Sequence, residues 1–253
     1  MSTKTFNLTY TQNSAFECSD NAFEKTGVII VAAGNASRMG GQNKVLTRLC
    51  SVPVIVRTVK AFEDLPFVED IVVVTRDDMV LDIQNLVSEY GINKVKDIVV
   101  GGNSRGESVK CGFERLKKNN AVKNVLIHDG VRPLVTKAVI EDVVKGVEEY
   151  GSAVPAVLLK DTVKEVGALG KVVNTPDRQA LRLIQTPQGF KKEIYAEALE
   201  KAGENLDKFT DDSAMVEKAG FTVYTTLGDY KNIKITTPED LALAAAFITL
   251  TEA

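Results

Sequence analysis

The sequence of 253 residues has few of the side chains that build metal clusters or disulfide frameworks. It contains one histidine, His128, and three cysteines, Cys18, Cys50 and Cys111, which stand far apart without a CxxC pair. A metal site made of several histidines is therefore excluded, and neither a zinc site nor a disulfide framework is expected. Cysteine usage of this kind is typical of a reducing compartment, so we expect a cytoplasmic protein.

Long apolar runs and a strong net charge are lacking too. No stretch approaches the roughly 18–20 apolar residues of a membrane-spanning helix, and the polar residues 2–7 do not form the apolar centre of a secretory signal. With a net charge of −3, a broad surface for nucleic acid is not expected. We therefore expect neither a membrane nor a nucleic acid as partner, and any phosphate-binding site must be local.

The two common phosphate-loop motifs, GxGxxG and GxxxxGK[ST], are also missing where a nucleotide loop is expected. The chain instead has GVIIVAAGNASRMGGQNK at residues 27–44. The apolar run 28–31 predicts a strand buried on both faces. Small residues follow it, so the backbone there can approach a ligand closely, and Arg38 and Lys44 add positive charge. We interpret this stretch as a cradle for a polyphosphate; the alternative is an ordinary turn with two solvated cations.

Strand-like and helix-like segments alternate from residue 27 onward. Buried strands are predicted at 70–75, 98–100, 124–127 and 153–157, and helices at 54–62, 79–90, 107–116 and 137–150. This alternation predicts an α/β fold with a doubly wound, mostly parallel sheet. We expect residues 27–253 to form a single domain, preceded by an N-terminal extension at 1–26.

The alternation changes at about residues 159–185. Two extended segments flank a glycine-containing turn at 167–170, which predicts a β-hairpin that protrudes from the main sheet. Such an arm serves either dimerisation or closure over a site. After it we expect helices at 191–202 and 211–218, strands at 221–225 and 231–235, and a final helix that begins at Thr237 and Pro238.

Ligands of parallel sheets bind beyond the carboxyl ends of the strands, which here are followed by residues 33–44, 101–108 and 129–132. Asp129 follows a buried strand and is placed to bind Mg²⁺, although a turn with Gly130 also explains it. His128 fits a packed or turn histidine better than a catalytic base. Four cations accompany the aspartate: Arg38, Lys44, Arg132 and Lys234. Together they indicate phosphoryl or nucleotidyl transfer with a metal.

A series of motifs in the same order strengthens this interpretation. The chain has AAGNASRMGGQNK, GGNSRGESV, HDGVRP, KDTVK, TPDR, QTPQGF, FTDDSA and NIKITTPEDL between about residues 27 and 248. This combination resembles the 2-C-methyl-D-erythritol 4-phosphate cytidylyltransferase family of non-mevalonate isoprenoid biosynthesis. The resemblance implies a Rossmann-like nucleotidyltransferase fold. It also implies a Mg²⁺-dependent reaction of CTP with methylerythritol 4-phosphate that gives CDP-methylerythritol and pyrophosphate.

The resemblance implies roles for individual residues as well. Three cations would hold the triphosphate and stabilise the reacting phosphate: Arg38, Lys44 and Lys234. The nucleotide-binding residues would be Ala32, Ala33, Gly34, Gly102, Asn103 and Ser108. The residues on the substrate side would be Asp129, Arg132, Thr162, Arg178 and Thr186, with Asp129 also next to the metal. The arm at 159–185 would build a homodimer.

The chain departs from the family pattern in and beside these loops. Ala36 stands where glycine or serine is usual, and Asn43 and Val45 replace the usual proline and glutamine beside the second cation. Asn103 stands where aspartate is frequent. These changes keep the cations and alter their surroundings.

Other functions share the core motifs. The nearest is ribitol-5-phosphate cytidylyltransferase, although TPDR and LRLIQTPQ resemble the methylerythritol enzyme more closely. A sugar-nucleotide synthase that uses UTP or GTP is a further alternative. The non-enzymatic alternative is a catalytically impaired homologue that only binds nucleotide. Against it stands the joint presence of four charged residues: Arg38, Lys44, Asp129 and Lys234.

Overall fold

The structure is a computed structural model that describes residues 23–34 and 43–252. Most of the predicted N-terminal extension therefore lies outside the described residues, as do Ala36 and Arg38. Residues just before the predicted domain start already belong to the folded body. Phe23 packs edge-on against Phe67, with 4.9 Å between ring centroids, and the backbone N–H of Glu24 donates to Glu148 Oε1 at 2.8 Å.

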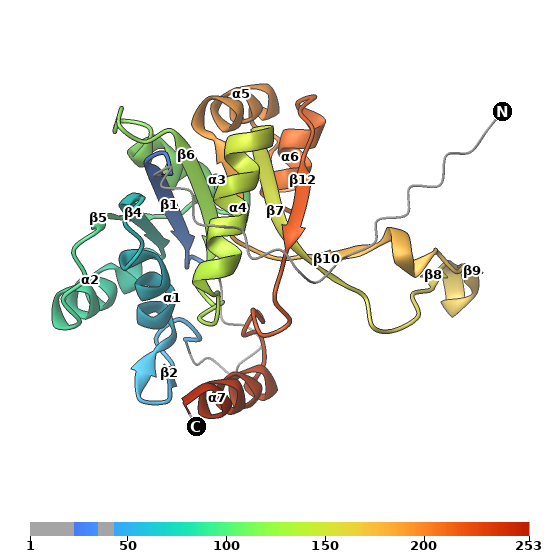
Figure 1. Ribbon diagram of the computed structural model, residues 1–253, viewed down its shortest axis with the longest axis horizontal. Helices are drawn as coiled ribbons and strands as arrows, with labels where there is room; N and C mark the ends of the chain where they lie inside the picture. Colours follow the sequence, from blue (N-terminus) through green and yellow to red (C-terminus); the bar gives the residue numbers. More distant parts are fainter. Residues whose placement is uncertain (1–22, 35–42, 253) are drawn as a thin grey trace.

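The centre of the described molecule is an eight-stranded sheet (Figure 1). Across the sheet the strands are β10 (Arg182–Ile184), β7 (Ser152–Leu158), β11 (Gln188–Lys191), β6 (Asn124–Asp129), β1 (Thr26–Val31), β4 (Val68–Thr75) and β5 (Val95–Val100), while β12 (Tyr224–Leu227) pairs with β7. Strands β5, β4, β1 and β6 are mutually parallel, whereas β11 is antiparallel to both of its neighbours. The predicted mostly parallel sheet is confirmed.

Helices cover both faces of this sheet, as the doubly wound pattern predicts. Their bounds are α1 (Val54–Glu63), α2 (Val80–Glu89), α3 (Arg105–Leu116), α4 (Lys137–Tyr150), α5 (Lys192–Ala202), α6 (Asp212–Lys218) and α7 (Pro238–Glu252). Successive strand residues point to opposite faces, so Val28 and Ile30 pack with α1 and α4 while Ile29 packs with α3 and α5. This two-sided burial explains why the central strands are continuous apolar runs.

Most helix ends follow from local signals in the sequence. Gly151 ends α4 with φ of 87°, a left-handed conformation that favours glycine. At the start of α7, Thr237 Oγ1 accepts from the backbone N–H of Asp240 at 3.4 Å, and Asp240 Oδ2 accepts from the N–H of Thr237 at 2.8 Å. This reciprocal capping explains why the helix begins at Pro238. The described part of the chain contains no helix that is both long and apolar enough to cross a bilayer.

The segment after β7 extends away from the sheet (Figure 1). In it, β8 (Glu165–Val166) and β9 (Val172–Asn174) form a separate antiparallel pair around the predicted turn. The prediction that the whole range up to residue 185 lies outside the main sheet is wrong, because β10 pairs with β7 through Arg182 to Leu158. The backbone of β10 therefore extends the sheet at its edge.

Other differences come from short elements. The strand predicted at 231–235 is wrong, since these residues have no strand pairing, although the N–H of Ile235 donates to Val131 O at 2.9 Å. The strand predicted at 221–225 begins later, as β12. The small hairpin of β2 (Arg48–Leu49) and β3 (Val52–Pro53) and the antiparallel β11 were not predicted. Such short strands depend on tertiary pairing more than on a local pattern.

Candidate functional site

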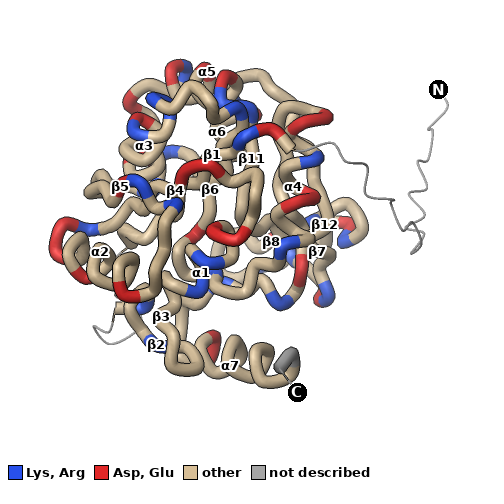
Figure 2. Tube along the Cα trace, turned by 60° about the vertical axis from the view of Figure 1, so that its left-hand side comes forward, with Lys and Arg blue, Asp and Glu red and all other residues tan. Residues whose placement is uncertain are grey.

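A cavity of about 540 Å³ lies beyond the carboxyl ends of the central strands. The register places these ends together, because Val31 at the end of β1 lies beside both Val74 of β4 and Asp129 of β6. Basic and acidic positions are interspersed around the sheet in Figure 2, so the site is distinguished by local geometry. The predicted residues that line the cavity are Ala32, Ala33, Gly34, Lys44, Gly102, Asn103, Ser108, Asp129 and Lys234.

One wall of the cavity is the turn between β5 and α3. Ser104 caps α3 by accepting from the N–H of Glu107 at 3.1 Å, and the Glu107 carboxylate accepts from the N–H of Asn103 at 2.7 Å. Ser108 lies one turn inside the helix, where its hydroxyl donates to Ser104 O at 2.8 Å. A Cβ on Gly101 would approach Ser108 Oγ to 2.6 Å. The wall is thus a closely packed turn whose shape is set before a ligand enters.

The segment around Lys44 forms another wall. The Asn43 carbonyl accepts from the N–H of Leu46 at 3.1 Å and from that of Thr47 at 3.0 Å. Val45 is buried, and its carbonyl accepts from the N–H of Ile55 at 3.0 Å. Asn43 and Val45 therefore hold a turn that presents Lys44 to the cavity, where no ion pair with another described residue is formed.

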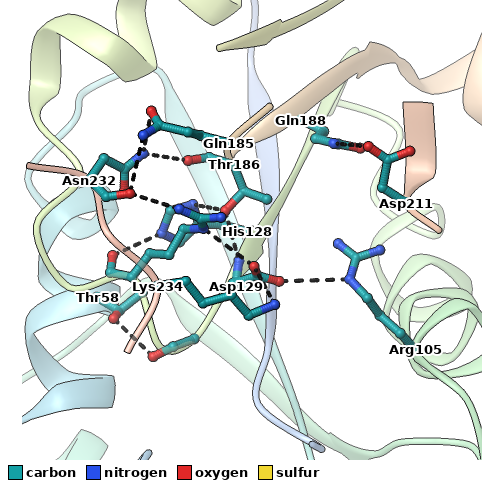
Figure 3. Close-up of polar contacts among 12 residues, drawn as sticks. Thr58, Arg105, His128, Asp129, Gln185, Thr186, Gln188, Asp211, Asn232 and Lys234 are labelled. Carbon is teal, nitrogen blue, oxygen red and sulfur yellow. Dashed lines mark hydrogen bonds and ion pairs between the residues drawn. The ribbon is translucent and has the colours of Figure 1, made fainter. Parts of the chain in front are cut away.

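Asp129 is the centre of a cluster of charges (Figure 3). Its Oδ2 lies 3.0 Å from Lys234 Nζ and 3.4 Å from Arg132 Nε, and its Oδ1 lies 3.7 Å from Arg105 Nε. Burial alone would raise the pKa of Asp129, but the three cations outweigh it and hold that pKa well below the usual value. The carboxylate is therefore ionised at neutral pH.

The other side of Asp129 is supported by His128 of β6 and by Thr186, which lies between β10 and β11. The backbone N–H of Asp129 donates to Thr186 Oγ1 at 3.1 Å, and Thr186 Oγ1 lies 3.0 Å from His128 Nδ1. His128 Nε2 lies 3.1 Å from the Arg132 carbonyl, which only accepts, so Nε2 carries the proton and Nδ1 accepts from Thr186. Burial lowers the pKa of His128 to about 4, so the ring is neutral and holds the loop.

Two predicted substrate-side residues thus lie beside the cavity instead of lining it. Thr186 is buried behind Asp129, and Arg132 Nη1 donates to Asn232 O at 2.7 Å. Asn232 in turn donates from Nδ2 to Thr186 O at 2.8 Å. These hydrogen bonds connect the loop after β6 to the segment before α7. They place Lys234 next to Asp129, although residues 231–235 do not form the predicted strand.

The predicted arm residues are not brought to the cavity of this chain. Thr162 and Arg178 are exposed, and Arg178 Nη1 donates to Lys160 O at 2.7 Å within the arm. Their predicted substrate role therefore requires a second copy of the chain or a movement of the arm. The third predicted cation, Arg38, lies outside the described residues.

Arg105 and Asp212 belong to the site but are missing from the predicted set. Arg105 lines the cavity, and its Nη1 lies 2.6 Å from Asp212 Oδ2. The sequence contains a weak signal for each, an arginine next to a Gly-Gly turn and an acidic pair before a helix. Their 107-residue separation in the chain hides the contact. The neighbouring Asp211 caps α6, since it accepts from the N–H of Ala214 at 2.9 Å.

The donor set is suited to a metal that arrives with a nucleotide. No cluster of three or more His, Cys, Asp or Glu side chains with metal-site geometry occurs among residues 23–34 and 43–252. Mg²⁺ commonly uses only one or two protein carboxylates, together with water and substrate phosphates. Asp129 fits this pattern, because within the described part of the chain its Oδ1 has only the 3.7 Å approach of Arg105. Cations outnumber carboxylates around the cavity, which favours a polyphosphate ligand.

Comparison with known proteins gives a consistent result. The family model for 2-C-methyl-D-erythritol 4-phosphate cytidylyltransferase (IspD) matches residues 26–250. The chain is 40% identical over 226 residues to the enzyme of that name from Alkaliphilus metalliredigens, covering 88% of this chain and 93% of the relative. It is 42% identical over 222 residues to that from Caldanaerobacter subterraneus, covering 87% and 97%.

Solved structures give the same result for the fold. The 4-diphosphocytidyl-2C-methyl-D-erythritol synthase of Anaerococcus prevotii has a TM-score of 0.77 and 29% identity, covering 89% of this chain and 99% of its own. The 2-C-methyl-D-erythritol 4-phosphate cytidylyltransferase of Thermus thermophilus has a TM-score of 0.69 and 27% identity, covering 89% and 99%. The likeness therefore extends over nearly all of the described chain.

Proposed function

Since the chain belongs to the 2-C-methyl-D-erythritol 4-phosphate cytidylyltransferase family, we propose that its cavity is where CTP and methylerythritol 4-phosphate react. Enzymes of this family join the two substrates, forming CDP-methylerythritol and releasing pyrophosphate. The observation that supports the location is the convergence of Lys44, Asp129 and Lys234 on one cavity, next to the small residues after β1. These side chains are 85 and 105 residues apart in sequence, so local structure alone does not account for their meeting.

In the proposed reaction a phosphate oxygen of methylerythritol 4-phosphate attacks the α-phosphorus of CTP. A new phosphorus–oxygen bond forms there, the bond to the β-phosphate bridging oxygen breaks, and its electrons leave with pyrophosphate. The attacking phosphate is already ionised, so no general base is needed. This agrees with a neutral His128 that is buried away from the cavity.

The chain's own contribution is positioning and charge. Lys44 and Lys234 stabilise the negative charge that accumulates in the transition state. Arg38 is the third cation that the sequence predicts for this role, and it lies outside the described residues. The turn from Gly101 to Ser108 and the residues 32–34 hold the cytosine and ribose. Asp129 would hold Mg²⁺, which would neutralise phosphate charge when bound.

The arm extends the proposal to a homodimer. Val166, Leu169 and Val172 are apolar and exposed in the single chain, which is unfavourable unless a surface covers them. In a dimer, Thr162 and Arg178 of one arm complete the acceptor site of the other subunit. Light scattering coupled to size-exclusion chromatography should give twice the 27.5 kDa chain mass; a monomer at micromolar concentration contradicts this part of the proposal.

The function is tested by pyrophosphate release from purified protein with Mg²⁺, each of the four nucleoside triphosphates, and either methylerythritol 4-phosphate or ribitol 5-phosphate. We expect release only with CTP and methylerythritol 4-phosphate. Release only with ribitol 5-phosphate would assign the chain to the sister activity. Absence of release with every pair, while CTP still binds, would identify a nucleotide-binding homologue.

A further inference from the structure

Arg105 bridges two carboxylates that belong to different parts of the fold. It is the first residue of α3; its Nη1 lies 2.6 Å from Asp212 Oδ2, and its Nε lies 3.7 Å from Asp129 Oδ1. In Figure 3 Arg105 reaches Asp129 from one side, while His128 and Asn232 lie on the other. The guanidinium thus connects the centre of the cavity to the start of α6.

The far end of this connection is buried. The Asp212 side chain is only 3% exposed, and its Oδ1 accepts from Tyr195 OH at 2.8 Å. Tyr195 is itself buried. Burial, and next the negative charge of Asp212, raise the pKa of Tyr195 well above the usual value, so its hydroxyl keeps its proton and donates the hydrogen bond. Burial opposes the charge of Arg105, but Asp212 and Asp129 outweigh it and raise its pKa. The chain of contacts is therefore Tyr195, Asp212, Arg105 and Asp129.

Stability alone does not explain this arrangement. A buried ion pair is typically no more stabilising than well-packed apolar residues of the same volume. Asp212 is also not needed as a helix cap, because Asp211 has that role. What the pair does achieve is to immobilise a long, flexible arginine side chain at the wall of the cavity.

We propose that Arg105 is a positioning residue of the transfer reaction, held in place by Asp212 and Tyr195. Lys234 and Arg132 both form ion pairs with Oδ2 of Asp129, whereas Arg105 approaches Oδ1 from the opposite side. Its tether keeps the carboxylate from turning toward Lys234 and Arg132 alone, and it keeps Oδ1 directed to the substrates. This inference rests on the proposed function, since it assigns a role within the same cavity.

The test is a double-mutant cycle on turnover with CTP and methylerythritol 4-phosphate, using Asp212→Asn, Arg105→Ala and the double variant. Asp212→Asn keeps the side-chain shape and removes the charge. It should lower kcat about tenfold, the order found for partners that orient a catalytic ligand, with a smaller change in KM for CTP. Because Asp212 acts through Arg105, the double variant should be no slower than Arg105→Ala. Tyr195→Phe should lower kcat in the same direction by a smaller factor.

The matched control lies on the same helix. Arg115 of α3 pairs with Asp97 at the protein surface, so Asp97→Asn breaks the same kind of pair far from the cavity and should leave kcat unchanged. A role confined to folding would lower the melting temperature and make the effects of Asp212→Asn and Arg105→Ala multiply. That outcome, or a kcat for Asp212→Asn equal to that for Asp97→Asn, overturns the inference. Lack of pyrophosphate release by the unmodified protein would instead overturn the proposed function.

Discussion

The buried neutral histidine makes the stability of this protein depend on pH in a predictable direction. His128 is fully buried, and its ring accepts from Thr186 and donates to the Arg132 carbonyl. Burial lowers its pKa to about 4 in the folded state, whereas an unfolded chain has a histidine pKa of about 6.5. Between these values the unfolded state binds a proton that the folded state does not. The folded state therefore has its full stability above about pH 6.5 and loses it as the pH falls toward 4.

The expected magnitude follows from the two pKa values. The full difference of about 2.5 units corresponds to about 3 kcal/mol, of which about 2 kcal/mol is lost between pH 7 and pH 5. Because His128 is the only histidine, no other side chain with an ordinary pKa titrates in that window. Carboxylates such as Asp129, whose pKa is lowered in the fold, keep their contribution to stability throughout this window and lose it only at lower pH.

Urea unfolding at half-unit pH steps from 5 to 8 measures this dependence. His128→Gln removes the titrating group and keeps a donor and an acceptor, so its stability should vary much less between pH 7 and 5, whatever its absolute value. A wild-type unfolding free energy that is flat within about 0.5 kcal/mol over this range would refute the reasoning. So would a His128→Gln variant with the wild-type slope, because the dependence would then belong to other groups.

Three further variants test the site and the packing around it. Lys44→Ala should lower kcat by about 10²–10³ without changing the melting temperature, since it removes one cation from the transition state; the exposed Lys118→Ala is its control, and near-normal turnover would remove Lys44 from the mechanism. Asp129→Asn removes a negative charge beside the phosphates, so CTP binding measured by calorimetry should be retained. Pyrophosphate release should fall by at least about 10². Weakened CTP binding with normal turnover would contradict this role. Gly101→Ala introduces a Cβ that meets Ser108 Oγ at 2.6 Å and Ala33 Cβ at 2.8 Å. It should cost about 1–3 kcal/mol in urea unfolding and weaken CTP binding; an unchanged affinity would show that the turn adapts.

The contacts within the site show how far sequence reasoning reaches. The strand ends at 31 and 100 were recognisable because a buried strand followed by glycine and polar residues is a local signal, whereas β6 continues to Asp129, two residues beyond its predicted end at 127. Lys234 was predicted from a family motif, but its neighbourhood was predicted as a strand. Its actual place depends on Ile235 pairing with Val131 and on Arg132 donating to the Asn232 carbonyl. Arg105 falls within the segment 101–108 that the sequence places beyond the strand ends, yet its partner Asp212 belongs to a helix that no local pattern links to it.

What the sequence determined by itself is therefore the layered α/β architecture, the ends of most long helices and the group of loops that form the cavity. Apolar periodicity, caps and glycine turns act over a few residues, so they can be read directly from the chain. The tertiary structure alone decided that three cations surround Asp129, that Thr186 and the Arg132 carbonyl are the hydrogen-bond partners of His128, and that β10 and β11 complete the sheet. These features depend on burial and on contacts between residues up to about a hundred positions apart, such as Arg132 with Asn232. Electrostatic and hydrogen-bond energies are set by such distances and by desolvation, and neither is present in a local pattern.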